Sequence, residues 1–298
     1  MTYSIEVSPL YRLPSKRRLC ELLFISRRRL KGLMSDSEYR EWHTKSGRLI
    51  EEPNAALKVV QARLKDLIAR IEHPSWLHSG VRGKSHITNA QQHTGLRCVG
   101  TIDIESFYRS TRKEYVFRFF RYLLHQPEDV AWVITDLSTY RGHLPTGSPS
   151  SQLLSFWAYR PMFEMMKERA EGHGGTLTLY VDDIAVSALE VLPSSMLSEI
   201  AETLLPFELR ARKSKTTRRN TSEWKVVTGA AISPTGELDV PNRLRERIHD
   251  QVRTMKGGRL SGRGLLRLQG LLSSARQIDG SFHESLYRYV RYLTSSRS

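Results

Sequence analysis

The sequence contains little cysteine and no long apolar run, and each scarcity excludes a class of protein. The two cysteines, Cys20 and Cys98, lie in neither a CxxC pattern nor a Cys/His cluster, so neither a disulfide framework nor a zinc site is indicated. The N-terminus lacks the apolar stretch of a signal peptide, and "LCELLFI" at Leu19 to Ile25 is too short to span a bilayer and contains a glutamate. We therefore expect a cytosolic protein with no membrane partner.

Acidic residues are also scarce relative to basic ones. Lys and Arg number 46 against 31 Asp and Glu, so the formal net charge is +15 and the sequence pI is about 10.0. Such an excess is typical of proteins that bind a phosphate backbone. A basic membrane-binding protein would concentrate this charge on one amphipathic helix, whereas here it is spread along the chain. Nucleic acid is therefore the expected partner.

The hydrophobic pattern predicts an α+β protein with two regions. Strand signals stop near Val240, where three basic helical pieces separated by glycines begin, so we predict a boundary between residues 1–240 and 241–298. The first region is expected to contain a helix or helix pair at 15–33, a short strand at 48–51, helices at 55–71, 112–124, 150–169 and 194–204, strands at 98–103 and 176–186, and a strand, turn and return strand at 223–237.

Three carboxylates follow strand-like segments. Asp103 ends a strand in "RCVGTIDIESFY", and Asp182 and Asp183 lie at the centre of "TLTLYVDDIAVSA". Taken alone, each acid is equally well explained as a helix cap or a turn residue. Gathered together, they would be costly unless a multivalent cation neutralised them, and Mg²⁺ is the hard, oxygen-binding candidate. Two such ions, roughly 3.5–4 Å apart, would serve nucleotidyl transfer.

Consecutive side chains on a strand point to opposite faces, so Asp182 and Asp183 cannot both point at the same ion unless a turn redirects one of them. We expect Asp182 to be the main ligand and Asp183 the adjunct. A further element, "HLPTGSPSSQLLSFW", has a compact turn containing Gly147 and hydroxyls such as that of Ser148 at the start of a helix. Such a turn suits close approach to a nucleotide or template backbone.

Together, "DIESFY", "LPTGSPSSQ" and "YVDDIAVS" resemble, in order and spacing, the three central motifs of the reverse transcriptase palm. "NAQQH", Asn89 to His93, and "VTG", Val227 to Gly229, are similar to two signatures of bacterial retron reverse transcriptases. The resemblance extends from about Lys45 to Asn242. It implies a right-hand polymerase fold with fingers, an antiparallel-sheet palm and a small helical thumb.

The resemblance also implies roles for individual residues. Asp103 and Asp182 would hold two Mg²⁺ ions with Asp183 beside them and the Ile104 carbonyl completing a metal shell, and Lys215 would protonate the leaving pyrophosphate. Tyr108 falls at the steric-gate position that rejects a ribose 2′-hydroxyl, although an ordinary core aromatic is the alternative. The predicted binding residues for the incoming deoxynucleoside triphosphate are Lys45, Arg48, Tyr108, Gly147 and Ser148.

The predicted partner is a cognate structured non-coding RNA, the msr-msd transcript. The resemblance implies that the enzyme primes from an internal guanosine 2′-hydroxyl and copies part of this RNA into branched msDNA. It also implies antiphage defence in the bacterial cytoplasm, with a separately encoded effector protein. The predicted RNA-binding residues are Asn89, His93, Arg243, Arg247, Arg288 and Arg291.

Two departures from the family pattern and three alternative functions stay open. The turn that usually reads LPQGxPxSP has Thr146 in place of Gln and Gln152 in place of Pro, which leaves the roles in that loop undecided. A group II intron or diversity-generating reverse transcriptase would share the palm. A non-catalytic nucleic-acid-binding protein on a polymerase fold would lack at least one of the acids, and all three are present.

Overall fold

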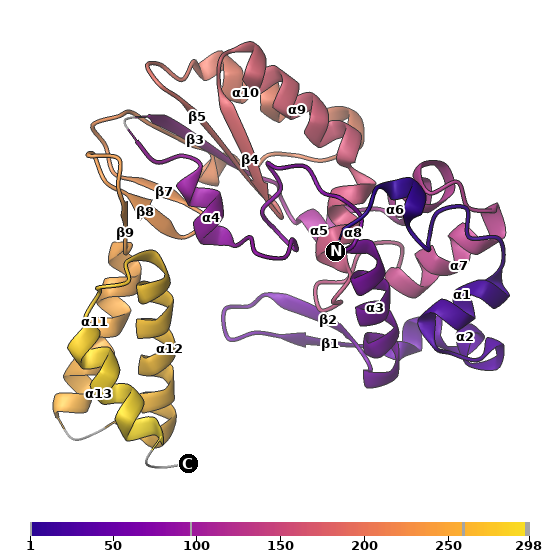
Figure 1. The fold of residues 1–298 in the computed structure, drawn as a ribbon, viewed down its shortest axis with the longest axis horizontal. Helices are drawn as coiled ribbons and strands as arrows, with labels where there is room; N and C mark the ends of the chain where they lie inside the picture. The colour runs from indigo at the N-terminus through magenta and orange to yellow at the C-terminus, as the bar shows by residue number, and fades with distance from the viewer. Residues whose placement is uncertain (1, 96, 258–259, 296–298) are drawn as a thin grey trace.

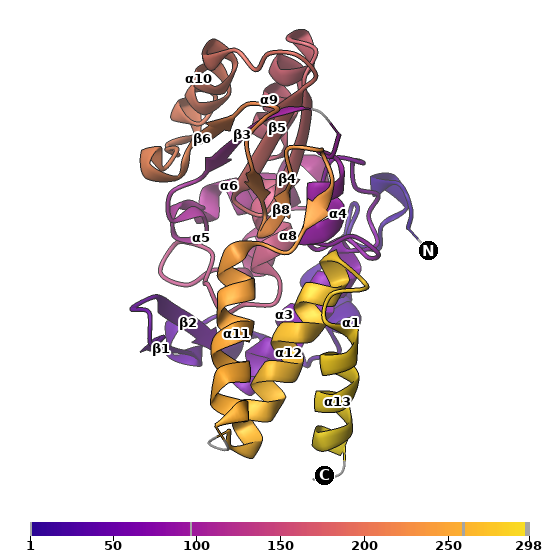
Figure 2. The same ribbon diagram turned by 90° about the vertical axis from the view of Figure 1, so that its left-hand side faces the viewer.

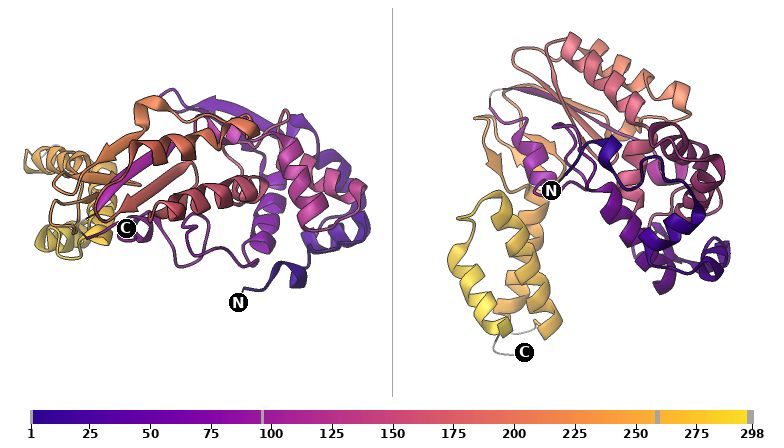
Figure 3. Two further views of the ribbon diagram at one scale, coloured as in Figure 1. Left: turned by 90° about the horizontal axis from the view of Figure 1, so that it is seen from above. Right: turned by 45° about the vertical axis from the view of Figure 1, so that its right-hand side comes forward.

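The computed structural model describes residues 2–95, 97–257 and 260–295 and confirms the α+β class. An antiparallel sheet formed by the segments expected to make the palm, called the palm sheet below, lies between an N-terminal helical region with a β-hairpin and a C-terminal lobe of helices (Figure 1). Viewed from above, the two helical regions lie at opposite ends of the molecule (Figure 3). None of the helices in the described ranges combines the length and the apolar character that a membrane span requires.

The palm sheet has the strand order β4-β5-β3-β6, and all neighbours are antiparallel. Alternation along the strands gives the sheet two buried faces. Leu177, Ile184 and Val186 join the main hydrophobic core, on the side of helices α9 and α10, whereas Ala185 packs with residues of α4 and the smaller sheet. The strands are β3 (Cys98–Asp103), β4 (Thr176–Tyr180), β5 (Asp183–Ala188) and β6 (Thr217–Arg219).

The N-terminal region contains the hairpin of β1 (Tyr39–His43) and β2 (Leu49–Pro53) and a group of helices. The segment 15–33 forms two helices because Phe24 takes a left-handed conformation after the first and Ser26 caps the second. Cys20 and Cys98 are buried free thiols. The helices are α1 (Lys16–Leu23), α2 (Arg27–Leu33), α3 (Ala55–Ile68), α4 (His86–Gln91), α5 (Phe107–Ser110), α6 (Lys113–Arg118), a π-helical turn (Phe119–Leu123) and α7 (Glu128–Ser138).

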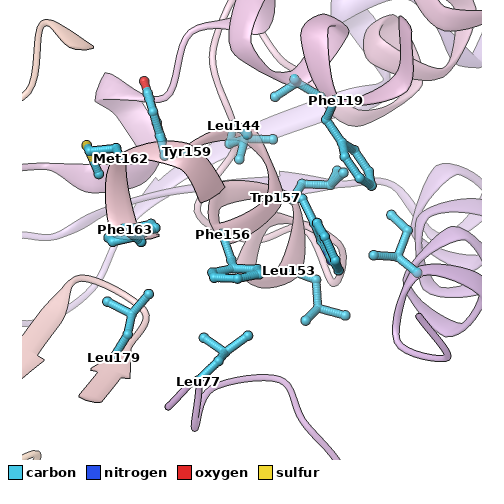
Figure 4. Packing of buried hydrophobic residues seen from close by; sticks show 14 of the residues in the cluster. Leu77, Phe119, Leu144, Leu153, Phe156, Trp157, Tyr159, Met162, Phe163 and Leu179 are labelled. Atoms are coloured by element: carbon cyan, nitrogen blue, oxygen red, sulfur yellow. The ribbon is translucent and has the colours of Figure 1, made fainter. Parts of the chain in front are cut away.

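The prediction of a single long helix at 150–169 is wrong. This segment forms two helices, α8 (Ser151–Ala158) and α9 (Arg160–Gly172), which meet at Tyr159. Pro161 has no N–H to continue the α8 ladder and its ring is incompatible with a helical carbonyl four residues earlier, so the chain restarts there. The break allows the aromatic residues on both helices to share one core (Figure 4), where Phe156 stacks on Phe163 with ring centroids 6.1 Å apart.

The C-terminal lobe follows a small antiparallel sheet of β7 (Lys225–Val227), β8 (Ala230–Ile232) and β9 (Leu238–Asp239). The expected three helices are α11 (Asn242–Lys256), α12 (Gly262–Ile278) and α13 (Glu284–Ser295), which lie below the palm in Figure 2. They have a hydrophobic cluster of their own, which includes Val240, Ile248 and Leu272. The remaining short elements are α10 (Ser194–Glu202) and 3-10 turns at Ile5–Val7, Asp36–Glu38, Leu205–Phe207 and Lys213–Lys215.

Candidate active site

The three predicted carboxylates come from the adjacent strands β3 and β5 and the turn before β5. Asp103 is paired with Asp183 in the β3 and β5 register, and Asp182 lies in the two-residue turn between Tyr180 and Asp183. The two acids therefore differ in backbone setting, with Asp182 in the turn and Asp183 in the first residue pair of β5. Val181 has a φ of 59°, which is unusual for a β-branched residue.

Two hydrogen bonds hold this strained turn. The Val181 N–H donates to Ser79 Oγ at 3.0 Å, and the Ile104 N–H donates to the Asp182 carbonyl at 3.0 Å. The second bond ties the turn to the residue after Asp103. Strain that is held in place by neighbouring contacts is typical of functional sites.

The electrostatics of the acids are those of crowded, partly buried carboxylates. Burial raises the pKa of Asp182, with a further contribution from the charge of Asp103. Burial and the neighbouring charges of Asp182 and Asp103 raise the pKa of Asp183 to about 6. Such shifts mark a site at which a bound cation would stabilise the charged carboxylates.

Asp103 is neutralised by two basic side chains. Its Oδ1 lies 2.5 Å from Lys215 Nζ, and its Oδ2 lies 3.2 Å from Arg212 Nε. In the described part of the chain, no three acidic, His or Cys side chains converge closely enough to hold a metal ion. Asp103 Oδ2 is nevertheless buried and accepts no hydrogen bond from the described residues. An all-oxygen donor set that includes a buried carboxylate oxygen without a hydrogen bond from the described residues fits a hard divalent cation.

A cavity of about 610 Å³ is lined by Asp182 and by the two partners of Asp103, whereas Asp103 and Asp183 are not part of its lining. Of the predicted nucleotide-binding residues, Arg48 and Tyr108 line it, whereas Lys45 lies exposed in the turn between β1 and β2 and is not part of the lining. Phe107 is the buried core aromatic, and Tyr108 stacks on it with a centroid separation of 6.2 Å. The other lining residues are Leu49, Ser106, Phe107, Arg109, Thr146, Val181, Asp182, Arg212 and Lys215.

The Gly147 loop approaches the protein's own β2 strand. The Gly147 N–H donates to the Glu51 carbonyl at 3.0 Å, and a Cβ added at Gly147 would lie 2.7 Å from that oxygen. Thr146 Oγ1 accepts from the Glu51 N–H at 3.0 Å and donates to the Leu49 carbonyl at 3.3 Å. Thr146 therefore joins this loop to β2 and lines the cavity, and Ser148 Oγ lies 3.0 Å from Ser150 Oγ.

Direct RNA contact by Asn89 and His93 conflicts with their complete burial. His93 Nδ1 lies 2.8 Å from Ser187 Oγ, and its Nε2 lies 2.7 Å from Thr178 Oγ1, so the ring joins the residues after α4 to β4 and β5. Asn89 Nδ2 donates to Thr228 Oγ1 at 3.3 Å. The segments "NAQQH" and "VTG" thus contact each other and attach α4 to both sheets.

The four predicted arginines of the C-terminal lobe divide into two pairs. Arg243 and Arg247 on α11 line a second cavity of about 1030 Å³, together with Arg267 and Trp224. Arg288 and Arg291 lie exposed on α13 outside that lining, and Arg288 forms an ion pair with Glu284. Sequence reasoning missed Arg267 and Trp224, although both lie in segments rich in basic residues.

Comparisons with known proteins agree with the motif-level resemblance. No protein-family model matches the chain. The Retron Se72 reverse transcriptase of Salmonella heidelberg is 26% identical over 226 residues, which cover 73% of this chain and 60% of that protein. The chain is similar to retron reverse transcriptases. The Retron Ec86 reverse transcriptase of Escherichia coli is 24% identical over 83% of this chain and 76% of its own length.

The share of each relative's length that this chain covers varies. The Retron Mx162 reverse transcriptase of Myxococcus xanthus is 25% identical over 85% of this chain, which spans 59% of that protein. Against the Se72 and Mx162 relatives, then, the chain spans about three fifths of their length. A solved structure of apo telomerase from Candida tropicalis, truncated from its C-terminal domain, aligns with a TM-score of 0.49 and 10% identity over 68% of this chain and 54% of that one.

Proposed function

We propose that the chain is an RNA-directed DNA polymerase of the retron type. The observation that carries the proposal is the position of Asp182, in a turn beside Asp103 and Asp183 and at the wall of a cavity lined by Arg48, Tyr108 and Lys215. This arrangement supplies acids for divalent cations, cations for a triphosphate, and an aromatic ring between them. The retron relatives support the same activity.

In the proposed mechanism, Asp103 and Asp182 would hold Mg²⁺ with Asp183 beside them, and the Ile104 carbonyl would be a further candidate ligand. Bound Mg²⁺ would activate the primer hydroxyl and neutralise charge on the leaving pyrophosphate. Arg48 binds phosphate oxygens from the fingers side, with Lys45 at the hairpin tip. Lys215, whose side chain is 56% exposed, can turn from Asp103 towards the pyrophosphate and donate its proton.

Tyr108 selects the sugar in this proposal. Burial, together with the negative charge of Asp182, raises the pKa of its hydroxyl, so the ring stays neutral. It lines the cavity beside Asp182, where it would pack under the deoxyribose and exclude a ribose 2′-hydroxyl. Gly147 and Ser148 contribute by fixing the loop that forms the neighbouring wall.

The template in this proposal is a cognate structured RNA, primed from an internal guanosine 2′-hydroxyl and copied into branched msDNA. The C-terminal lobe would select it, since Arg243, Arg247 and Arg267 surround a cavity with the half-exposed Trp224. Guanidinium groups bind phosphates and an exposed indole stacks on an unpaired base. We further propose a role in antiphage defence with a separately encoded effector.

The test is expression of the chain with its neighbouring non-coding RNA, followed by extraction of nucleic acid. The Asp182→Asn variant removes one acid of the site, and Asp66→Asn, an exposed acid on α3, is the matched control. We expect RNase-sensitive, branched DNA from the wild type and the control and none from Asp182→Asn. Equal DNA from all three would refute the catalytic assignment, and linear DNA on added primers alone would favour a group II intron-like or diversity-generating enzyme.

A further inference from the structure

A carboxylate that the proposed chemistry does not use is buried beside the 610 Å³ cavity. Glu51 on β2 is 1% exposed. Its Oε1 accepts a hydrogen bond from His143 Nε2 at 2.9 Å and lies 3.7 Å from Arg109 Nε. Its Oε2 is buried and accepts no hydrogen bond from the described residues. A buried charge with one unsatisfied oxygen costs stability, which points to a role other than stabilising the fold.

Glu51 connects three segments around the cavity. Its backbone binds the Thr146 hydroxyl and the Gly147 N–H, and its side chain binds His143, at the start of the same loop, and Arg109 on α5. Burial would raise the pKa of Glu51, but the hydrogen bond and charge of His143 and the charge of Arg109 outweigh it and lower the pKa. Glu51 is therefore an anion held between a loop and a helix that both line the cavity.

The cavity cations differ in their partners. Arg212 and Lys215 are engaged by Asp103. In the described part of the chain, Arg48 forms no ion pair, and the carboxylate nearest to Arg109 is Glu51, which approaches it through Nε. The Arg109 side chain is 55% exposed and lines the cavity with Arg48 and Tyr108. An Arg held at Nε and otherwise exposed can present its terminal nitrogens to a phosphate group.

We propose that Arg109 is a further polyphosphate-binding residue, and that Glu51, fixed by His143, is the positioning residue that directs its guanidinium into the cavity. The ligand class is the triphosphate of an incoming nucleotide or the pyrophosphate product, so this inference rests on the proposed function. The pair adds a second arginine to Arg48 and links phosphate binding to the loop and β2, which together form the other wall.

The first experiment measures binding without catalysis. Titration calorimetry with inorganic tripolyphosphate and excess Mg²⁺ compares the wild type with Arg109→Gln, Arg109→Lys and Glu51→Gln. Arg112→Gln, whose side chain is 51% exposed and lies outside the cavity lining, is the matched control. We expect Arg109→Gln to weaken binding about 10- to 100-fold, the range for loss of one charge-assisted contact. Arg109→Lys should weaken tripolyphosphate binding less than Arg109→Gln does, and Glu51→Gln should weaken it about threefold to tenfold.

The second experiment separates binding from chemistry. On a primed RNA template, Arg109→Gln and Glu51→Gln should raise KM for deoxynucleotide and the inhibition constant of pyrophosphate in parallel, with kcat within about threefold of the wild type. Equal thermal unfolding midpoints establish that the variants are folded. Glu52→Gln, whose carboxylate pairs with Arg40 and Lys58 instead, is the control for loss of charge on β2.

The outcomes separate this inference from the proposed function. Unchanged tripolyphosphate binding in Arg109→Gln overturns the inference, whatever the activity of the protein. A wild type that binds tripolyphosphate through Arg109 but extends no primer contradicts the proposed function and leaves the binding site supported. If Glu51→Gln fails to fold, comparison of Arg109→Gln with Arg109→Lys still decides the role of Arg109.

Discussion

Replacing His93 by leucine tests whether the "NAQQH" segment holds the palm together or touches RNA. Leucine keeps an apolar side chain of moderate size but removes both ring nitrogens. Thr178 Oγ1 and Ser187 Oγ then lose their partners at 2.7 and 2.8 Å, inside a region where all three residues are at most 1% exposed. We expect a loss of folding stability and no specific loss of RNA affinity in the folded protein.

The expected size of the effect follows from the two abandoned hydroxyls. A buried polar group without a partner costs about 1–3 kcal/mol, and each hydroxyl can recover part of this by turning to a backbone carbonyl. We therefore expect the free energy of unfolding to fall by about 2–4 kcal/mol. Adding Thr178→Val and Ser187→Ala to His93→Leu should restore most of the lost free energy of unfolding, because neither hydroxyl is then left without a partner.

The assay is urea unfolding followed by tryptophan fluorescence and circular dichroism, with RNA binding measured below the transition. Gln91→Leu, an exposed position at the end of α4 and two residues before His93, is the control and should leave the free energy of unfolding within about 0.5 kcal/mol of the wild type. A His93→Leu protein with wild-type stability and lost RNA binding would refute the structural role and restore the direct contact.

Two further predictions concern the pH dependence of folding stability and the space around Gly147. Burial lowers the pKa of His93 to about 3 and those of His73 and His78 to about 4, so these rings bind protons more readily when unfolded. Stability should therefore fall as the pH drops below about 6.5, partly opposed by Asp183, whose pKa is raised to about 6. Urea unfolding between pH 7 and 4.5 should give a shallower decline for His93→Leu, and parallel curves would contradict this. Gly147→Ala would place a Cβ 2.7 Å from the Glu51 carbonyl and should cost about 1–3 kcal/mol, measured by thermal unfolding, whereas Gly172→Ala, with open space around it, should not.

The parts of the fold that sequence predicted are those governed by local pattern. The strand-like segments at 98–103 and 176–186 identified β3, β4 and β5, and the structure has a turn at Asp182, without which two consecutive strand residues could not both face one ion. The helix at 55–71 was found from its apolar stripe, and it ends at Ile68, a few residues early. These features depend on neighbours in the chain, so the sequence alone determines them.

Elements that depend on distant partners were missed or misjudged. Strand β1 is exposed along most of its length and exists through pairing with β2, so it has no apolar alternation to recognise. Helix α7 was not predicted although its buried side is apolar. Asn89 and His93 were assigned to RNA because of motif resemblance, and only their hydroxyl partners, 85 to 139 residues away, show that they are internal.

The distinction between local pattern and distant contacts also explains why the sequence predicted only some of the site residues. Asp103, Asp182 and Asp183 were identified because they lie in strand-like segments whose order and spacing match the palm motifs, although each acid alone is equally well explained as a cap or a turn residue. Glu51, Arg109 and Arg212 violate no such rule, since acidic and basic residues beside turns are common in a basic chain. Their importance depends on contacts between distant segments: Arg212 and Lys215 neutralise Asp103, and the buried Glu51 pairs with Arg109, which lines the same cavity as Arg212 and Lys215.

The basic side chains beside Asp103 offset the energetic cost of burying its charge. Asp103 is 4% exposed, so the cost of burying its charge must be offset within the protein when no cation is bound. Arg212 and Lys215 provide that compensation, and both side chains remain more than one third exposed. They can therefore move to phosphate oxygens when another cation neutralises Asp103, without a rearrangement of the buried sheet. Under the proposed function, the basic side chains that balance Asp103 in the free protein would be available to the substrate in the complex, so the basic excess of the chain would serve the catalytic centre as well as nucleic-acid binding.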